Sequence, residues 1–242
     1  MCCPVGTLIE KPDWHRVKDI LDVKKRVTVA QTAPAVRVAV GEEFGKEPGT
    51  ITTGQMVNAL RACRFDLVLD TDFAADVTIT EEANELLARV RGEKPHEKLP
   101  LFTSCCPAWI RYVEIYRPDL IPHLSSCKSP QQMMSSIIKN GPLADRLKEE
   151  PFVVSIMSCT AKKEEAVRPS MYGDTDAVLT TRELAKLIKN RGITFSSLPN
   201  DGKYDSPLGE STGAAVIFGA SGGVLEAVFL PLPMLPLPMF LA

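Results

Sequence analysis

Two adjacent cysteines, Cys105 and Cys106, stand between an apolar run and an amphipathic segment. The apolar run covers residues 99–102, and the segment that follows begins with Pro107 and contains Trp109. This order predicts a strand, a tight turn and a helix, because proline is tolerated in the first turn of a helix. Free backbone N–H groups at the start of a helix attract negative charge. They are expected to lower the pKa of a nearby thiol and to favour the thiolate, which binds metals and attacks electrophiles.

The two cysteines are not expected to bind one metal ion together. Neighbouring side chains of an extended chain point to opposite sides, so one cysteine would bind a ligand and the other would have a separate role. The alternative for this pair taken alone is two buried cysteines at the end of a strand, because free cysteine is among the most buried residue types.

A third cysteine occupies the same kind of position further along the chain. Residues 151–157 are apolar and typical of a strand, and Cys159 follows them, with Lys162 and Lys163 in a predicted helix. Loops at the carboxyl ends of strands are where sites of α/β proteins are expected. Positive charge there stabilises a thiolate or an anionic ligand. This recurrence favours a functional site over packed cysteines.

Three motifs, in this order, resemble the catalytic domain of FeFe (iron-only) hydrogenases. They are Thr-Ser-Cys-Cys-Pro-x-Trp at 103–109, Ser-Cys-Lys-Ser-Pro-Gln-Gln at 126–132 and Met-x-Cys-Thr-Ala-Lys-Lys-Glu at 157–164. The resemblance extends from about Cys3 to about Ala227. The Nar1/Narf-like iron–sulfur assembly proteins share the general layout, so a non-catalytic assembly protein or a sensory protein is the alternative.

The resemblance implies a cofactor and its ligands. Cys106 and Cys159 would be thiolate ligands of a 4Fe–4S cluster, which in the family is bridged to a two-iron unit carrying CO and cyanide (the H-cluster). Cys105 would pass protons to the two-iron unit, Lys162 would hydrogen-bond a cyanide, and backbone N–H groups around Ala35 would face the cyanide ligands. The implied reaction is the reversible reduction of protons to H2. The implied partners are ferredoxin or a similar electron carrier and the hydrogenase maturation proteins.

Glu82 and Glu85 lie three residues apart in a helix predicted over residues 78–90, so they share one face. Beside the apolar stripe, at the edge of the buried face, such a carboxylate can be partly desolvated and can carry protons near neutral pH. The common alternative is a pair of solvated surface charges. In the resembling family the matching Glu-x-x-Glu belongs to the proton path, with Arg89 as its outer charged member and Ser125 as its relay hydroxyl.

Strand and helix patterns alternate along the chain, which predicts an α/β protein with mainly parallel sheets and helices on both faces. The resemblance adds that this is a two-lobed catalytic domain, here incomplete. Capping boxes are predicted for the helices that begin near Thr78 and Ser129, and another helix is predicted over 181–190. The predicted strands are residues 27–30, 65–69, 152–157 and 176–180.

The overall composition excludes some classes of function. The 242 residues carry 28 Lys and Arg against 30 Asp and Glu, a balance that argues against nucleic acid as a main partner. Seven cysteines without a signal peptide predict a reducing compartment, either the cytoplasm or the lumen of an organelle such as a hydrogenosome, and not secretion. The apolar end of the chain is too short and too rich in proline for a membrane span.

The chain is divided by its resemblance into three parts. Residues 1–25 are expected to be the remnant of a ferredoxin-like segment with a connecting helix, residues 26–227 a partial catalytic domain, and residues 228–242 an unrelated apolar tail. The family's third motif, which supplies two further cysteine ligands, has no counterpart in this sequence. We therefore expect a domain truncated at both ends and, as an isolated polypeptide, inactive.

Overall fold

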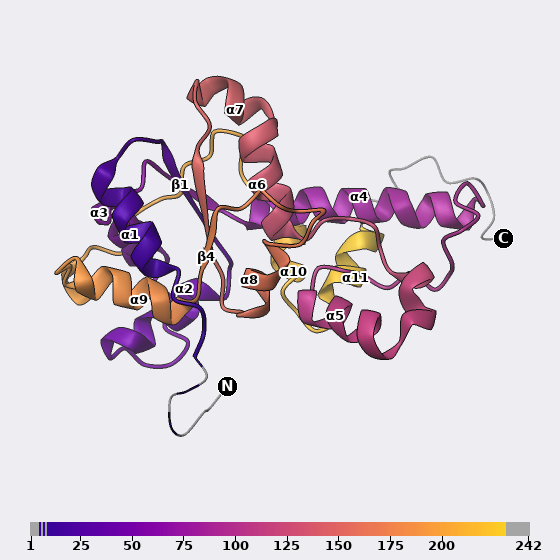
Figure 1. Ribbon diagram of the computed structural model, residues 1–242, viewed down its shortest axis with the longest axis horizontal. Coiled ribbons are helices and arrows are strands. Elements are labelled where there is room, and N and C mark those ends of the chain that lie inside the picture. Colours follow the sequence, from indigo (N-terminus) through magenta and orange to yellow (C-terminus); the bar gives the residue numbers. More distant parts are fainter. Residues whose placement is uncertain (1–4, 6, 8, 231–242) are drawn as a thin grey trace.

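A sheet of four parallel strands forms the centre of the computed structural model, which describes residues 5, 7 and 9–230 (Figure 1). The strand order is β2-β1-β3-β4, and all three neighbouring pairs are parallel. The strands are β1 Thr28–Thr32, β2 Leu67–Asp70, β3 Phe152–Ile156 and β4 Ala177–Leu179. The predicted α/β class with a parallel sheet is confirmed.

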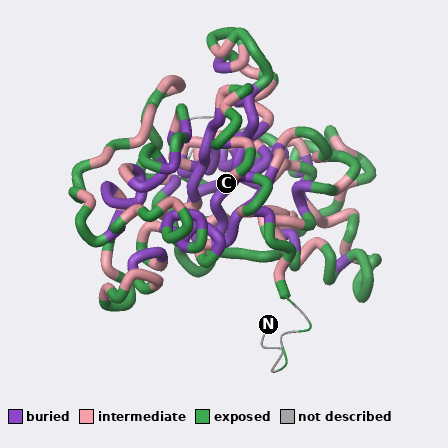
Figure 2. The backbone as a smooth tube through the Cα atoms, turned by 60° about the vertical axis from the view of Figure 1, so that its left-hand side comes forward, coloured by how far each residue is buried: buried purple, intermediate pink, exposed green. Residues whose placement is uncertain are grey.

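The strands are buried because helices cover both faces of the sheet, as is usual for parallel sheets. Every residue of β1 and β3 is buried. Successive side chains point to opposite faces. Ala30 and Val154 thus belong to one apolar cluster, and Val29 and Val153 belong to another. Figure 2 shows the buried backbone gathered around the sheet and the exposed backbone in the surrounding segments.

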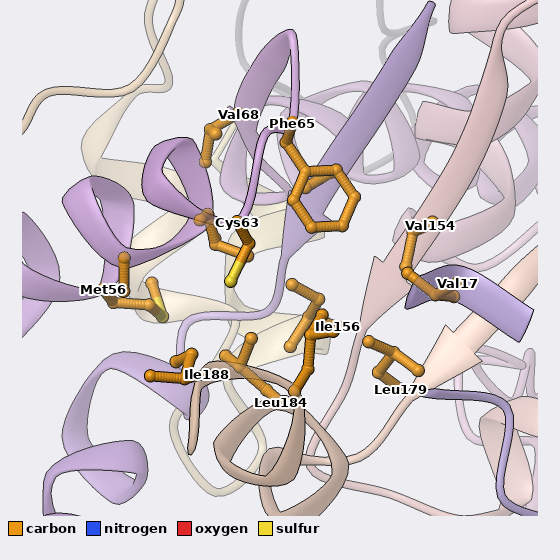
Figure 3. Close-up of a cluster of buried hydrophobic side chains, with 14 of the residues drawn as sticks. Val17, Met56, Cys63, Phe65, Val68, Val154, Ile156, Leu179, Leu184 and Ile188 are labelled. Carbon is orange, nitrogen blue, oxygen red and sulfur yellow. The ribbon is translucent and has the colours of Figure 1, made fainter. Parts of the chain in front are cut away.

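Four α-helices and two short 3-10 helices supply the apolar residues of the first face. They are α1 Trp14–Val23, α2 Val36–Ala39, η1 Val40–Phe44, α3 Thr53–Ala62, α9 Thr181–Asn190 and η3 Phe195–Ser197. Figure 3 shows how Val17 of α1, Met56 of α3 and Ile188 of α9 gather around Ile156 of β3. The bounds of α9 agree with the helix predicted over 181–190.

The second face is covered by α4 Asp72–Val90, α6 Pro130–Asn140 and α7 Pro142–Leu147. Helix α4 continues far beyond the sheet, and α10 and α11 pack against it (Figure 1). The remaining helices of this part are α5 Pro107–Tyr116, η2 Pro118–His123, α8 Ala161–Glu165, α10 Gly213–Ile217 and α11 Gly223–Phe229. Helix α5 packs against α8.

A topological switch point lies at the carboxyl ends of β1 and β3. The strand that follows β1 in sequence pairs on one side of it, and β3 pairs on the other. Ligands of open α/β sheets bind at such a point. Ala35 follows β1 there and Cys159 follows β3. The backbone N–H of Ala33 donates to the carbonyl of Ile156 at 3.0 Å, which joins the two strand ends.

Helix α4 begins at Asp72, well before the start predicted at Thr78. The Thr78 hydroxyl donates to the carbonyl of Ala74 at 3.0 Å, as a threonine inside a helix does. Asp72 lies in the first turn, where a carboxylate interacts favourably with the positive end of the helix dipole. The capping box predicted at Thr78 is therefore wrong.

Two further local predictions are wrong. In place of a strand over residues 99–102, Phe102 makes an isolated bridge with Leu124. Ser129 does occupy the N-cap of α6, but its side chain makes no capping hydrogen bond, so the predicted capping box is absent from this helix.

Two predictions concern the ends of the chain. Cys3 and residues 231–242 lie outside the described residues. The structure therefore does not address the cysteine of the expected ferredoxin-like remnant or most of the apolar tail. Helix α11 continues through residue 227 to Phe229, and Val228 is fully buried. Within the described part of the chain, no helix combines the length and the apolar character needed to cross a membrane.

Candidate functional site

Two glutamates and an arginine lie on the buried face of α4. Glu82, Glu85 and Arg89 are 0%, 5% and 5% exposed. The two glutamates were expected at the edge of this face, but the structure places them within it, whereas Leu86, which follows Glu85, is only half-buried. Several partners of Glu85 and Arg89 belong to residues 98–127, the segment that also carries the two adjacent cysteines.

Arg89 joins α4 to both ends of this segment. Its guanidinium donates to the carbonyl of Lys98 at 2.8 Å, to the carbonyl of Leu124 and to the carboxylate of Glu85. Its Nε lies 3.0 Å from a carboxylate oxygen of Glu97. The Arg89 side chain, predicted as the outer charged member of the proton path, is 0% exposed and forms an ion pair with Glu85.

Glu85 is surrounded by hydrogen-bond donors. The Ser125 hydroxyl donates to its Oε2 at 2.9 Å, the backbone N–H of Ser126 at 3.1 Å and the Cys127 thiol at 3.4 Å. Burial alone would raise the pKa of Glu85, but these donors and Arg89 outweigh it and hold the pKa below its usual range. Glu85 is therefore ionised at neutral pH.

Glu82 has the opposite environment. Neither of its carboxylate oxygens has a hydrogen-bond partner among the described residues. Burial and the negative charge of Glu85 raise the pKa of Glu82 to about 7, against the smaller opposing influence of the Ser125 hydroxyl and the Ser104 backbone. Ser125 was expected between the two glutamates, and it does influence both, but its hydroxyl donates to Glu85.

The Cys105 thiol lies close enough to Glu82 for the carboxylate to raise the pKa of the thiol. Burial raises the pKa of Cys105 to about 11, and the nearby Lys162 ammonium offsets this only in part. The expected lowering of this pKa by the start of α5 is wrong, because the half-buried thiol loses more hydration than nearby positive charge restores. Cys105 is therefore a protonated thiol at neutral pH.

Lys162 holds the backbone at the two adjacent cysteines. Its Nζ donates to the carbonyl of Cys105 at 2.9 Å and to Oε2 of Glu165 at 2.8 Å. Gln131 of α6 also donates to Glu165, at 3.3 Å. Glu165 and Gln131 were not among the site residues predicted from the sequence. The three-residue spacing of Lys162 and Glu165 on a helix was a usable signal for the first of them.

Cys106 and Cys159 are both exposed and lie at the starts of two helices that pack together. Cys106 is the N-cap of α5, and Cys159 comes shortly before α8. Cys159 follows a strand of the sheet as predicted, whereas Cys106 follows an irregular segment. No cluster of three or more His, Cys, Asp or Glu side chains is arranged to hold a metal ion in the described part of the chain.

Ala35 is exposed at the N-cap of α2, on the carboxyl edge of the sheet. Cys159 lies after the neighbouring strand β3, so the two residues flank the topological switch point. Cys127, to which the sequence reasoning gave no role, contacts Glu85 instead. Its position two residues after Ser125 was the signal for this contact.

Comparison with known proteins identifies a family. Residues 26–232 match the family described as iron only hydrogenase large subunit, C-terminal domain. The chain is 50% identical over 235 residues to the NADP-reducing hydrogenase subunit HndD of Solidesulfovibrio fructosivorans, covering 93% of this chain and 40% of that protein. It is 51% identical over 206 residues to the periplasmic Fe hydrogenase large subunit of Nitratidesulfovibrio vulgaris, covering 82% of this chain and 48% of that protein. The chain thus spans less than half the length of these relatives.

A solved structure and a more distant relative extend the comparison. The structure is an apo FeFe-hydrogenase HydA1 variant from Chlamydomonas reinhardtii, with a TM-score of 0.76 and 43% identity over 89% of this chain and 56% of that one. The chain is also 31% identical to cytosolic iron-sulfur assembly component 3 of Mus musculus, over 92% of this chain and 50% of that protein.

Proposed function

This chain belongs to the iron-only hydrogenase family, and on that premise we propose that its site serves the reversible reduction of protons to H2. Ferredoxin or a similar carrier is the proposed electron donor, and hydrogenase maturation proteins are the proposed suppliers of the cofactor. The observation that carries the proposal is the pair of Cys105 and Glu82, a protonated thiol beside a buried carboxyl group that titrates near neutral pH.

The donor atoms suit an iron–sulfur cofactor. Thiolates are the ligands of iron–sulfur clusters, and Cys106 and Cys159 are free and exposed where two helices meet. They are the proposed ligands of a 4Fe–4S cluster, which takes four thiolates, so the described residues supply two of them by motif. When bound, the cluster and its two-iron unit supply the electron transfer and the hydrogen chemistry.

The residues of the chain itself are proposed to move protons and to position the cofactor. Cys105 gives up its thiol proton and regains it from Glu82. Glu82 is reprotonated through the Ser125 hydroxyl, which can donate and accept at once. Glu85 and Arg89 form the next, charged part of this relay.

Lys162 and the turn at Ala35 are the proposed contacts to the anionic ligands of the cofactor. An ammonium donates a charge-assisted hydrogen bond to an anion, and a backbone N–H adds a neutral one. Lys162 uses two of its three N–H groups on Cys105 and Glu165, which leaves one for such a ligand.

A role in iron–sulfur assembly is the second candidate, because the chain is 31% identical to an assembly component. Its identity to two hydrogenase subunits is 50% and 51%. A cluster carrier also has no need of a thiol linked to buried carboxyl groups. The hydrogenase function is therefore favoured.

The test uses Cys105→Ala in the cofactor-loaded protein extended to carry all four cluster thiolates. The expected result is a loss of H2 production of about 100-fold or more, the usual contribution of a general acid, with unchanged iron content. Cys63→Ala is a matched control, because Cys63 is also buried but lies in the apolar cluster shown in Figure 3. An unchanged rate in Cys105→Ala would remove Cys105 from the mechanism.

A further inference from the structure

Cys127 contacts three parts of the proposed relay at once. Its thiol donates to Oε2 of Glu85 at 3.4 Å, and its backbone N–H donates to the Ser125 hydroxyl at 3.2 Å. Its carbonyl accepts a hydrogen bond from the Ser104 hydroxyl at 3.0 Å, next to Cys105 in the chain. Cys127 thus connects the carboxylate, the relay hydroxyl and the segment that carries the reactive thiol.

These contacts fix the direction of the Ser125 hydroxyl. A hydroxyl has one proton and two lone pairs. The proton is given to Glu85, and one lone pair accepts the N–H of Cys127. One lone pair remains, and Glu82, whose oxygens have no other partner in the described part of the chain, is the carboxyl group beside it. Ser125 is thereby held ready to receive a proton from Glu82 and to pass its own to Glu85, or to work in the reverse direction.

We propose that Cys127 is a positioning residue of the proton relay, which holds the Ser125 hydroxyl and the Glu85 carboxylate in one fixed arrangement. This inference rests on the proposed function, because it assigns a task to Cys127 only if protons pass through Ser125.

Glu85 is faced by one cation, by two carboxyl groups and by neutral donors. Arg89 lies on the same helix, and its Nε is 3.2 Å from Glu85 and 3.0 Å from Glu97. The carboxyl group of Glu82, one turn earlier on the helix, also interacts with Glu85. From the segment after η2, Glu85 is faced by the neutral groups of residues 125–127.

Two properties make the Cys127 thiol a constant donor. Lys128, the next residue, is engaged by Asp174, so its ammonium does not take over the contact. Burial and Glu85 keep the pKa of the Cys127 thiol at about 12, so it stays a neutral donor across the working pH range.

The first experiment measures the contact without using activity. The S–H stretching band of Cys127 is obtained as the infrared difference between the purified wild-type protein and Cys127→Ala. The band is expected at lower frequency than that of a free thiol, and it should move towards the free-thiol frequency in Glu85→Gln. The same difference for Cys63→Ala should not respond to Glu85→Gln. A Cys127 band at the free-thiol frequency in the wild type would overturn the proposal.

The second experiment compares Cys127→Ala with Cys127→Ser in the cofactor-loaded protein extended to carry all four cluster thiolates. Loss of the thiol hydrogen bond should lower the rate of H2 production about ten-fold, which is the value of one hydrogen bond to a charged group, because the Ser125 hydroxyl and the Glu85 carboxylate are no longer held in one arrangement. The hydroxyl of Cys127→Ser donates to the same oxygen and should restore the wild-type rate. Equal rates for the wild type and Cys127→Ala, or no recovery in Cys127→Ser, would overturn the proposal.

Different results would disprove the proposed relay and the proposed role of Cys127. If Cys127→Ala changes nothing while Glu82→Gln stops H2 production, the relay stands and the role of Cys127 is disproved. If Glu82→Gln and Cys105→Ala both leave the rate unchanged, the proposed relay itself is disproved, and the role of Cys127 falls with it, even where the infrared band confirms its contact with Glu85.

Discussion

At the scale of single residues, Glu82 and Glu85 show how environment separates two identical side chains. Both are buried on the same helix, but Glu85 accepts hydrogen bonds from several donors and Glu82 from none among the described residues. Burial without donors disfavours the charged form, and donors favour it. A carboxyl group that titrates near neutral pH and an ionised one therefore stand three residues apart, which is an arrangement suited to proton transfer.

The raised pKa of Glu82 predicts a pH dependence of stability. Its pKa rises from 4.5 in the unfolded chain to about 7 in the folded protein, so the folded state binds more protons between these values. The free energy of unfolding should fall as the pH rises through this window, by about 3 kcal/mol from this residue. In Glu82→Gln this part of the fall should be absent, as measured by urea unfolding at about pH 5 and about pH 8.

The matched control for this prediction is Glu81→Gln, the exposed neighbour on the same helix. It should keep the wild-type pH dependence, because its exposed carboxylate loses no hydration on folding. If Glu82→Gln and Glu81→Gln respond alike to pH, Glu82 does not titrate between its unfolded and folded pKa values.

Arg89→Ala should strongly destabilise the protein, by about 3–5 kcal/mol, because it leaves the buried Glu85 charge uncompensated. Arg89→Lys should recover only part of this loss, since an ammonium cannot replace the planar guanidinium that reaches Glu85, Lys98 and Leu124 together. Arg111→Ala is the control, because its ion pair with Glu114 is exposed and such pairs contribute at most about 1 kcal/mol. Chemical denaturation compares the three. Equal losses of unfolding free energy for Arg89→Ala and Arg111→Ala would show that Arg89 does not stabilise the buried Glu85 charge.

At the scale of elements, two helices of similar length begin with different N-caps. At α9 the Thr180 hydroxyl accepts the N–H of Glu183, and the Glu183 carboxylate accepts the N–H of Thr180, which is a complete capping box. At α6 the Ser129 hydroxyl is buried and has no partner in the part of the chain that the structure describes. A suitable residue type at an N-cap thus does not ensure the hydrogen bond.

Thr180→Ala is expected to lower the free energy of unfolding by about 1 kcal/mol, the usual value of an N-cap hydrogen bond. Ser129→Ala is expected to change it by less than about 0.5 kcal/mol or to raise it slightly, since it removes a buried hydroxyl that is not hydrogen-bonded. Thermal unfolding of the two variants side by side tests the difference. A larger loss for Ser129→Ala than for Thr180→Ala would contradict it.

At the scale of the whole molecule, the sheet order places the proposed ligands. The loops after β1 and β3 meet at the switch point, and α5 packs against α8, so Ala35, Cys159 and Cys106 are carried to one region from distant parts of the sequence. Their proximity therefore depends on the strand order and on the packing of α5 against α8.

A polypeptide of these 242 residues is expected to bind iron and sulfide at less than one 4Fe–4S cluster per chain. By motif it supplies the thiolates of Cys106 and Cys159, whereas a stable cluster takes four. Iron and sulfide analysis after anaerobic reconstitution measures the ratio, and the double variant Cys106→Ala, Cys159→Ala should bind still less. Full occupancy, or H2 production from a reduced viologen by this polypeptide, would show that other residues replace the missing thiolates.

The sequence by itself determined the α/β class, most strands and helices, and the family. The buried strand β3 is a mostly apolar run, and α9 has a strong 3.6-residue pattern, so these elements are encoded locally. The cysteine motifs are local as well, because each proposed ligand, Cys106 and Cys159, stands beside the start of a helix.

Only the tertiary structure decided the strand order, the burial of Arg89 and the protonation of Cys105 and Glu82. These properties depend on which groups meet across long stretches of chain: Arg89 is satisfied by carbonyls far along the sequence, and Ser125 donates to Glu85 from another segment. A pKa reflects the balance of lost hydration against gained hydrogen bonds, and both are properties of packing. The residue types were therefore readable from the sequence, and their charge states were not.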